Sequence, residues 1–205
     1  MSIKESRDHR RIETAPDPPT DPPRRTRRRK IDRDRIAAAA LEVGFADLTV
    51  ESVAAALGVT HSTLYHHVRN RDELLALAVD RAAAARPWPD ATGNWHDDLQ
   101  AASRAVWELL VANPGLARAS VGATDPGPTA VQRVEQLVGQ LIGDGFDPED
   151  ALLAVDAVID LPVDVAIRAP SHGQEPGLDN QAAVWFERKL ELVLAGIAAR
   201  LAPST

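Results

Sequence analysis

The sequence predicts an all-α protein: an N-terminal three-helix helix-turn-helix domain followed by a larger helical C-terminal domain, with about nine to ten helices in total. Two observations support this fold class. Apolar residues recur at three- and four-residue spacing through most of the chain after residue 30. Glycine, proline and asparagine interrupt that spacing repeatedly, and neither a strand-like alternation of useful length nor an internal repeat is present.

Composition narrows the class of protein further. With 205 residues, the chain can bury a sizeable core, and its lack of cysteine excludes disulfides, thiolate metal sites and a cysteine nucleophile. There is no apolar run of the roughly 18 residues that a membrane span needs, and the N-terminus lacks the apolar core of a signal peptide. We therefore expect a cytoplasmic protein.

Charge is distributed unevenly along the chain. Residues 1–33 carry 11 Lys and Arg against 6 Asp and Glu, whereas the rest carries 12 against 24. Residues 1–30 also hold five of the 15 prolines and few apolar residues, so we expect a disordered basic arm there. It is either a solvated tail or an arm that follows DNA phosphates. Its basic cluster consists of Arg24, Arg25, Arg27, Arg28, Arg29 and Lys30.

The first predicted domain covers residues 31–86 and contains the three helices of the helix-turn-helix domain and a long fourth helix, with recognisable end signals. Hydroxyl or amide side chains that can cap a helix precede three of the helices, and glycine follows two. These helices are predicted from Ile31 to Gly44, over 50–57 after Thr49, over 61–68 after Thr60, and from Arg71 after Asn70.

The second predicted domain covers residues 95–203, beyond a segment rich in proline and glycine at 86–94. Its helices are all amphipathic, and turns that contain glycine or proline separate most of them. They are predicted over residues 95–111, 116–121, 129–142, 147–169 and 180–201, with a linker at 170–177 before the last helix.

Residues 52–68 have the pattern of a helix-turn-helix. Ala54 allows two helices to approach closely, and Gly58 supplies the backbone conformation of a tight turn. The outward positions of the following helix are polar or aromatic and none is acidic, which suits a helix that enters a DNA major groove. These positions are Thr60, His61, Ser62, Thr63, Tyr65, His66 and His67. Arg69 and Arg71 follow where they can reach phosphates.

Residues 35–79 resemble the N-terminal domain of TetR-type transcriptional regulators, the tetracycline repressor family. The most specific stretch is 63–75, TLYHHVRNRDELL, which is close to the family signature TLYxHVxNKxxLL. The resemblance implies that Thr49 contacts a phosphate, that the residues of the third helix read the groove, and that Arg71 replaces a phosphate-holding lysine. Glu51 stands where some members have a guanine-reading arginine, so the operator sequence cannot be transferred.

The resemblance also implies a homodimer on a pseudo-palindromic double-stranded DNA operator, released when a small molecule binds the C-terminal domain. A pivot of the helix at 71–85 would transmit the signal. An apolar stripe on the last helix is compatible with a dimer interface, although it could instead pack only inside its own protomer. The stripe includes Phe186, Leu190, Val193, Leu194 and Ile197.

Candidate ligand-pocket residues are Trp107, Ser120, Gln136, Asp156 and Asp160. Asp156 and Asp160 lie on one helix face and form either an acidic pocket wall for a cationic ligand or a solvated acidic face. Ser120 occupies the place of the histidine that coordinates the drug's magnesium in tetracycline-type members, which disfavours such a ligand. We predict no cofactor and no metal site.

Two other functions are alternatives to a ligand-responsive repressor. The chain could bind DNA without an inducer, gripping it largely through the basic arm. An enzyme is not expected, because the sequence has no serine elbow, no glycine-rich phosphate loop and no metal-ligand pattern.

Overall fold

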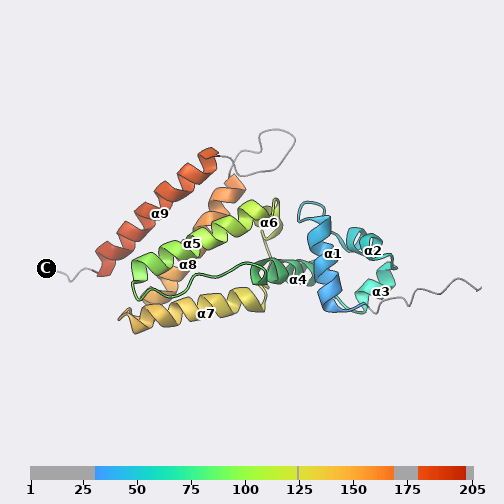
Figure 1. Cartoon of the computed structure of the whole chain (residues 1–205), viewed down its shortest axis with the longest axis horizontal. Helices are drawn as coiled ribbons and strands as arrows, with labels where there is room; N and C mark the ends of the chain where they lie inside the picture. The colour runs from blue at the N-terminus through green and yellow to red at the C-terminus, as the bar shows by residue number, and fades with distance from the viewer. Residues whose placement is uncertain (1–30, 124, 169–179, 202–205) are drawn as a thin grey trace, which may run out of the picture. The chain divides into compact units, whose positions relative to one another are not determined.

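The computed structural model describes residues 31–123, 125–168 and 180–201, and in these ranges the chain forms nine α-helices and no strand (Figure 1). The prediction of an all-α fold is confirmed. The helices are α1 (Arg33–Val43), α2 (Val50–Leu57), α3 (His61–Tyr65), α4 (Arg71–Ala84), α5 (Trp95–Ala112), α6 (Leu116–Ala119), α7 (Pro128–Gly143), α8 (Pro148–Arg168) and α9 (Asn180–Leu201). The predicted basic arm and the linker at 170–177 lie outside the described residues.

Side-chain caps begin the helices of the first domain where the sequence predicts them. The side chains of Thr49, Thr60 and Asn70 each accept a hydrogen bond from the backbone N–H three residues further on. At Thr49 the bond is reciprocal, because the Ser52 hydroxyl also accepts the N–H of Thr49 at 3.0 Å. These caps fix where α2, α3 and α4 start.

The third helix is shorter than predicted: α3 ends at Tyr65 and not at Val68. The backbone N–H groups of His67 and Val68 both donate to the Leu64 carbonyl, at 2.9 and 3.1 Å. The bond from His67 spans only three residues, so the helix tightens into a turn at its end. His66 and His67 therefore lie in this turn and not on a regular helix.

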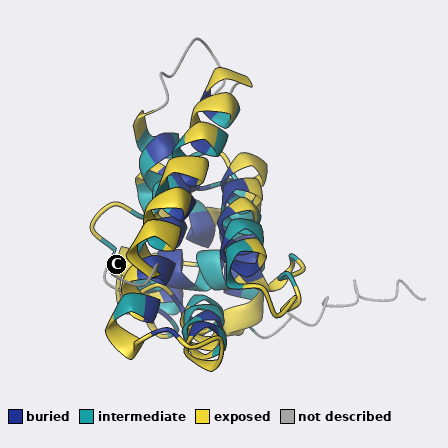
Figure 2. Cartoon of the chain, turned by 90° about the vertical axis from the view of Figure 1, so that its left-hand side faces the viewer, coloured by how far each residue is buried: buried dark blue, intermediate teal, exposed yellow. Residues whose placement is uncertain are grey.

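The helices α1 to α9 form one compact unit that contains two hydrophobic clusters. Figure 2 shows buried residues on the inner sides of the helices and exposed residues outside. The first cluster joins α1–α4 and also includes Leu110, Leu116 and Ala117 from α5 and α6. The second is built from α5, α7, α8 and α9, where the Trp107 and Phe186 rings stack with centroids 4.7 Å apart. The predicted domain boundary near residues 86–95 stays a prediction.

Close contact between the loop before α6 and the loop between α1 and α2 requires glycine at residue 115. Gly115, before α6, has a φ of +85°, and a Cβ there would lie 3.0 Å from the Ala46 nitrogen in the loop between α1 and α2. A side chain would therefore be strained by its own backbone and would also push the two loops apart.

Two side chains join α4 to α7. Asp80 Oδ1 accepts the Thr129 N–H at 2.7 Å, which satisfies a free donor in the first turn of α7. Arg133 Nη2 donates to the carbonyls of Ala83 and Arg86 at the end of α4, both at 2.9 Å. The α4 helix, which follows the helix-turn-helix, is thus anchored on α7 by one hydrogen bond that its side chain accepts and two that Arg133 donates.

Helix α8 runs continuously through Pro162. Proline has no N–H, so the carbonyl of Val158, four residues earlier, lacks its usual helical donor. The buried hydroxyl of Ser103 on α5 supplies that donor at 2.7 Å. A buried α5–α8 hydrogen bond therefore compensates for the proline.

We expect Ser103→Ala to lower the free energy of unfolding by about 1–3 kcal/mol, because it leaves a buried carbonyl without a donor. Urea denaturation followed by circular dichroism measures this change. Adding Pro162→Ala restores an N–H to α8 and should recover part of the loss. An S103A variant as stable as the parent would show that the bond contributes nothing.

Candidate nucleic-acid interface

The turn between α2 and α3 sets the direction of the third helix. Gly58 adopts a left-handed conformation with φ 65° and ψ 37°, which ends α2. The Val59 N–H then donates to the Ala54 carbonyl at 3.0 Å. Ala54 is 1% exposed, as expected for a small residue where helices pack closely. The predicted roles of both small residues in the motif agree with this geometry.

Helix α3 has one buried side and one accessible side. Leu64 is fully buried in the first hydrophobic cluster, whereas Tyr65 next to it keeps 51% of its surface exposed. All ten residues predicted to bind DNA keep at least part of their surface accessible. Thr49, Thr60, His61, Ser62, Tyr65, His66, Arg69 and Arg71 are exposed, and Thr63 and His67 are half-buried.

The accessible residues differ in what their polar atoms already do. The Thr49 hydroxyl accepts the Ser52 N–H and donates to the Ser52 hydroxyl, and the Thr60 hydroxyl bonds to both the N–H and the hydroxyl of Thr63. These three threonines therefore stabilise helix starts as well as lying on the surface. The contact role that the sequence predicts for each stays a prediction.

Arg71 is held against the loop that precedes α2. Its Nε donates to the Leu48 carbonyl at 3.1 Å, immediately before Thr49. The guanidinium has further N–H groups on its other nitrogens, and these can serve an external acceptor. Arg71 could therefore bind a DNA phosphate, the role that the resemblance to TetR-type regulators implies.

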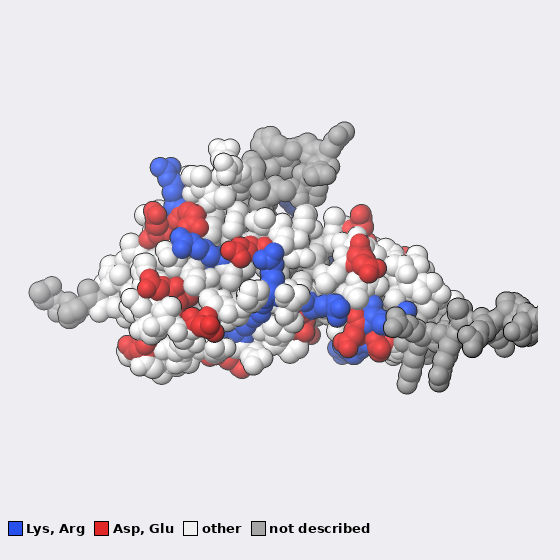
Figure 3. Space-filling view, in the orientation of Figure 1, with Lys and Arg blue, Asp and Glu red and all other residues white. Residues whose placement is uncertain are grey.

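Sequence reasoning missed Glu73, which binds Arg33 at the start of α1 and Arg69 in the segment between α3 and α4. Glu73 Oε1 accepts Arg33 Nη2 at 2.8 Å, and Oε2 accepts the backbone N–H and the Nε of Arg69 at 2.8 and 3.0 Å. The bond from the Arg69 backbone and those from the two side chains lower the pKa of Glu73 to about 2. The spacing of Arg69 and Glu73, four residues apart, was the available signal. On the face shown in Figure 3, acidic and basic groups lie side by side around α1.

The five candidate pocket residues have different surroundings. Trp107 is buried in the second cluster, while Gln136, Asp156 and Asp160 are exposed on α7 and α8. The half-buried Ser120 donates its hydroxyl to the Leu116 carbonyl at 3.0 Å. Partial desolvation and the neighbouring Asp156 raise the pKa of Asp160. The ligand-pocket assignment stays a prediction.

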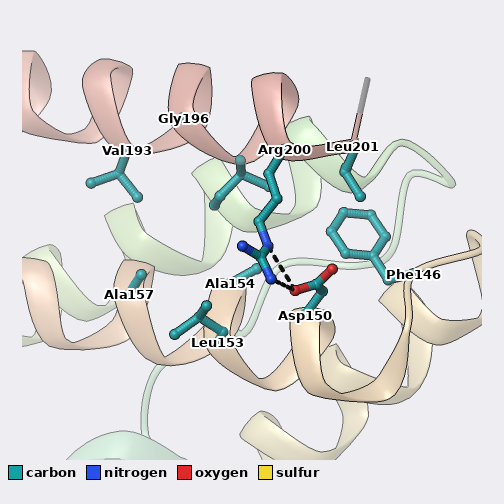
Figure 4. A pocket seen from close by; sticks show the side chains of 10 residues that line it. Phe146, Asp150, Leu153, Ala154, Ala157, Val193, Gly196, Arg200 and Leu201 are labelled. Carbon is teal, nitrogen blue, oxygen red and sulfur yellow. Dashed lines mark hydrogen bonds and ion pairs between the residues drawn. The ribbon is translucent and has the colours of Figure 1, made fainter. Parts of the chain in front are cut away.

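A groove of about 210 Å³ lies between the start of α8 and the end of α9 (Figure 4). An ion pair between Arg200 and Asp150 crosses it at 2.7 Å. Its other lining is mostly apolar and includes Phe146, Leu153, Val193, Ile197 and Leu201. The same two helices expose the large apolar side chains of Leu152, Leu153, Val184, Trp185, Leu192 and Leu201.

Some residues of the apolar stripe predicted as a dimer interface line this groove, and the others lie in the core. Phe186, Leu190 and Leu194 are at most 1% exposed and pack inside their own protomer, as the alternative interpretation expected. Val193 and Ile197 are partly accessible and line the groove. The interface itself stays a prediction.

Among the described residues, metal-ligand clusters and membrane-spanning helices are both absent. These residues include no group of three or more His, Cys, Asp or Glu side chains that could hold a metal ion. None of their helices combines the length and apolar character needed to cross a membrane.

In the described residues, the helical fold and the accessible third helix define an all-α protein with an N-terminal helix-turn-helix. Residues 34–78 match the family profile described as bacterial regulatory proteins, tetR family. This match confirms the resemblance to TetR-type regulators for the helix-turn-helix region, residues 34–78 of the chain.

Relatives and solved structures agree with this assignment. An HTH-type transcriptional regulator of Saccharopolyspora erythraea is 31% identical over 62% of this chain and 56% of its own length. The tetracycline repressor protein class D of Escherichia coli is 29% identical over 70% of this chain and 68% of its own. A TetR variant of Acinetobacter baumannii in complex with minocycline superposes with a TM-score of 0.70 at 27% identity, covering 85% of this chain and all of that one. The chain spans about half the length of the first two curated relatives.

Proposed function

We propose that this protein is a sequence-specific DNA-binding transcriptional regulator of the cytoplasm, a homodimeric repressor that a small-molecule ligand releases from its operator. The observation that carries the proposal is the surface of α3. It presents Ser62 and Tyr65 to solvent, and the turn that follows presents His66, while Leu64 anchors the helix in the core. Hydroxyl, phenol and imidazole groups can meet base edges and phosphates in a major groove.

The exposed apolar side chains of α8 and α9 support a homodimer. Leu152 and Leu153 on α8 and Trp185 and Leu192 on α9 are each more than half exposed. Apolar surface concentrated on two adjacent helices is typical of a protein–protein interface. Two copies joined there would present two α3 helices to a pseudo-palindromic operator.

Ligand control is supported by the connection between α4 and the second domain. The A. baumannii TetR variant binds minocycline and has the same fold, which favours a small-molecule site in the C-terminal helices here. Asp80 and Arg133 tie α4 to α7, so a ligand that moves α7 would also move α4 and the helix-turn-helix. Binding in this domain could thereby change the separation of two recognition helices.

Fluorescence anisotropy with DNA from the region upstream of the protein's own gene tests the proposal. We expect preferential binding to one segment over a scrambled segment of equal length at moderate salt. Equal affinity for both would contradict a sequence-specific regulator. We propose no enzymatic activity, in agreement with the transcriptional regulators that this chain resembles.

A chain that begins at residue 31 separates this function from a DNA-binding protein without an inducer. If the basic arm supplies most of the binding free energy, its removal should abolish binding. It should also reduce the slope of log affinity against log salt concentration by about 0.9 for each lost phosphate contact. We expect a weaker but still sequence-selective protein, because the groove-facing residues remain. Anisotropy titrations at several salt concentrations measure both quantities.

A further inference from the structure

Glu73 is bonded on both oxygens to arginines that themselves remain accessible. The Glu73 side chain is 13% exposed, whereas those of Arg33 and Arg69 are 55% and 85% exposed. Arg33 also donates through Nη1 to the carbonyl of His67, in the turn that follows α3. One carboxylate therefore connects the start of α1, the segment that follows the recognition helix and the first turn of α4.

An ionised carboxylate at this position has two opposite effects on DNA binding. Its charge repels phosphates, which weakens binding. Its hydrogen bonds also restrain two long cationic side chains, so that less conformational freedom is lost when they meet a phosphate. Glu73 uses only the Nε of the Arg69 guanidinium, and the remaining N–H groups can serve another acceptor.

We propose that Glu73 is a positioning residue of the DNA-binding site, whose carboxylate holds Arg69 and Arg33 in place to bind the DNA backbone beside α3. The benefit of this restraint exceeds the repulsion from the carboxylate charge. The inference rests on the proposed DNA-binding function. It predicts that removal of the Glu73 charge weakens DNA binding, whereas charge counting alone predicts stronger binding.

A comparison of Glu73→Gln with Asp72→Asn tests the inference in the full chain. Both substitutions remove one negative charge from the first turn of α4, and Asp72 is exposed with no hydrogen bond or ion pair among the described residues. We expect D72N to bind the preferred DNA segment as tightly as the parent or more tightly. E73Q should bind it about tenfold more weakly, because the arginines lose their charged acceptor.

Salt dependence distinguishes positioning from a general loss of stability. A partly unfolded E73Q population would lower affinity by one factor at every salt concentration. Loss of one or two arginine contacts should instead reduce the log–log slope by about 0.9 for each contact. Circular dichroism at the assay temperature confirms that the variant is folded.

A double-mutant cycle completes the test. In a chain that already carries Arg33→Ala and Arg69→Ala, E73Q should cause no further loss of affinity, because the residues it positions are gone. An E73Q variant that binds as tightly as D72N, or that loses the same factor in both backgrounds, overturns the inference alone. A parent chain without sequence preference would overturn the proposed function as well.

Discussion

The double variant Tyr65→Ala/Arg71→Ala is expected to bind its operator at least about a hundredfold more weakly than the parent chain. Tyr65 is the largest accessible side chain on α3, and Arg71 is held beside the start of α2 with N–H groups to spare. In a dimer each substitution acts twice, so the losses from groove and phosphate contacts accumulate. Fluorescence anisotropy at one fixed salt concentration measures the change.

Stability should change little in this double variant, because Tyr65 is 51% exposed and Arg71 contributes one hydrogen bond to the fold. Arg81→Ala is the matched control: it removes an exposed arginine from the same helix, ten residues further along α4. The R81A variant should keep parental affinity. If the double variant also keeps it, the surface of α3 is not what contacts DNA.

The substitution Leu192→Glu is expected to produce a folded monomer whose affinity for the full operator falls by at least about a hundredfold. Leu192 is 74% exposed on α9, so the change costs the isolated protomer little. In a dimer joined through α8 and α9, the new carboxylate would be buried against an apolar surface without a partner. A monomer can engage only one half-site, which removes the gain from joining two binding modules.

Sedimentation velocity gives the oligomeric state of this variant, and anisotropy gives its affinity. Val131→Glu provides the control, since Val131 is a similarly apolar residue, 41% exposed, on α7. We expect V131E to remain dimeric and to bind DNA normally. Should L192E sediment as the same species as the parent, the exposed face of α9 is not a surface that joins two copies.

The helix-turn-helix could be read from the sequence because its determinants are local. Thr49, Thr60 and Asn70 cap helices through bonds that span three residues, and Gly58 ends α2 through its own backbone conformation. Such signals act over a few residues and need no knowledge of the tertiary fold. The predicted end of α3 was wrong by three residues. Val68 continues the apolar spacing of the helix, although the backbone has already tightened into a turn at His67.

The surfaces of the second domain could not be read in the same way. Apolar periodicity identifies which face of a helix is apolar. It does not show whether that face packs inside its own protomer or against a second copy. Phe186 and Leu190 pack inside their own protomer, whereas Trp185 and Leu192, which lie off the predicted stripe, are exposed. Glu73 was missed for a related reason, since its bond to Arg33 joins residues 40 positions apart in the chain.

Selection of the full chain against a pool of random double-stranded oligonucleotides shows whether two copies of the chain read DNA together. We expect enrichment of one pseudo-palindromic sequence whose half-site centres lie about 34–36 Å, or a multiple of that distance, apart along the duplex. A pool that remains random after selection at moderate salt, or enrichment of a single unpaired half-site, would contradict two α3 helices reading DNA together.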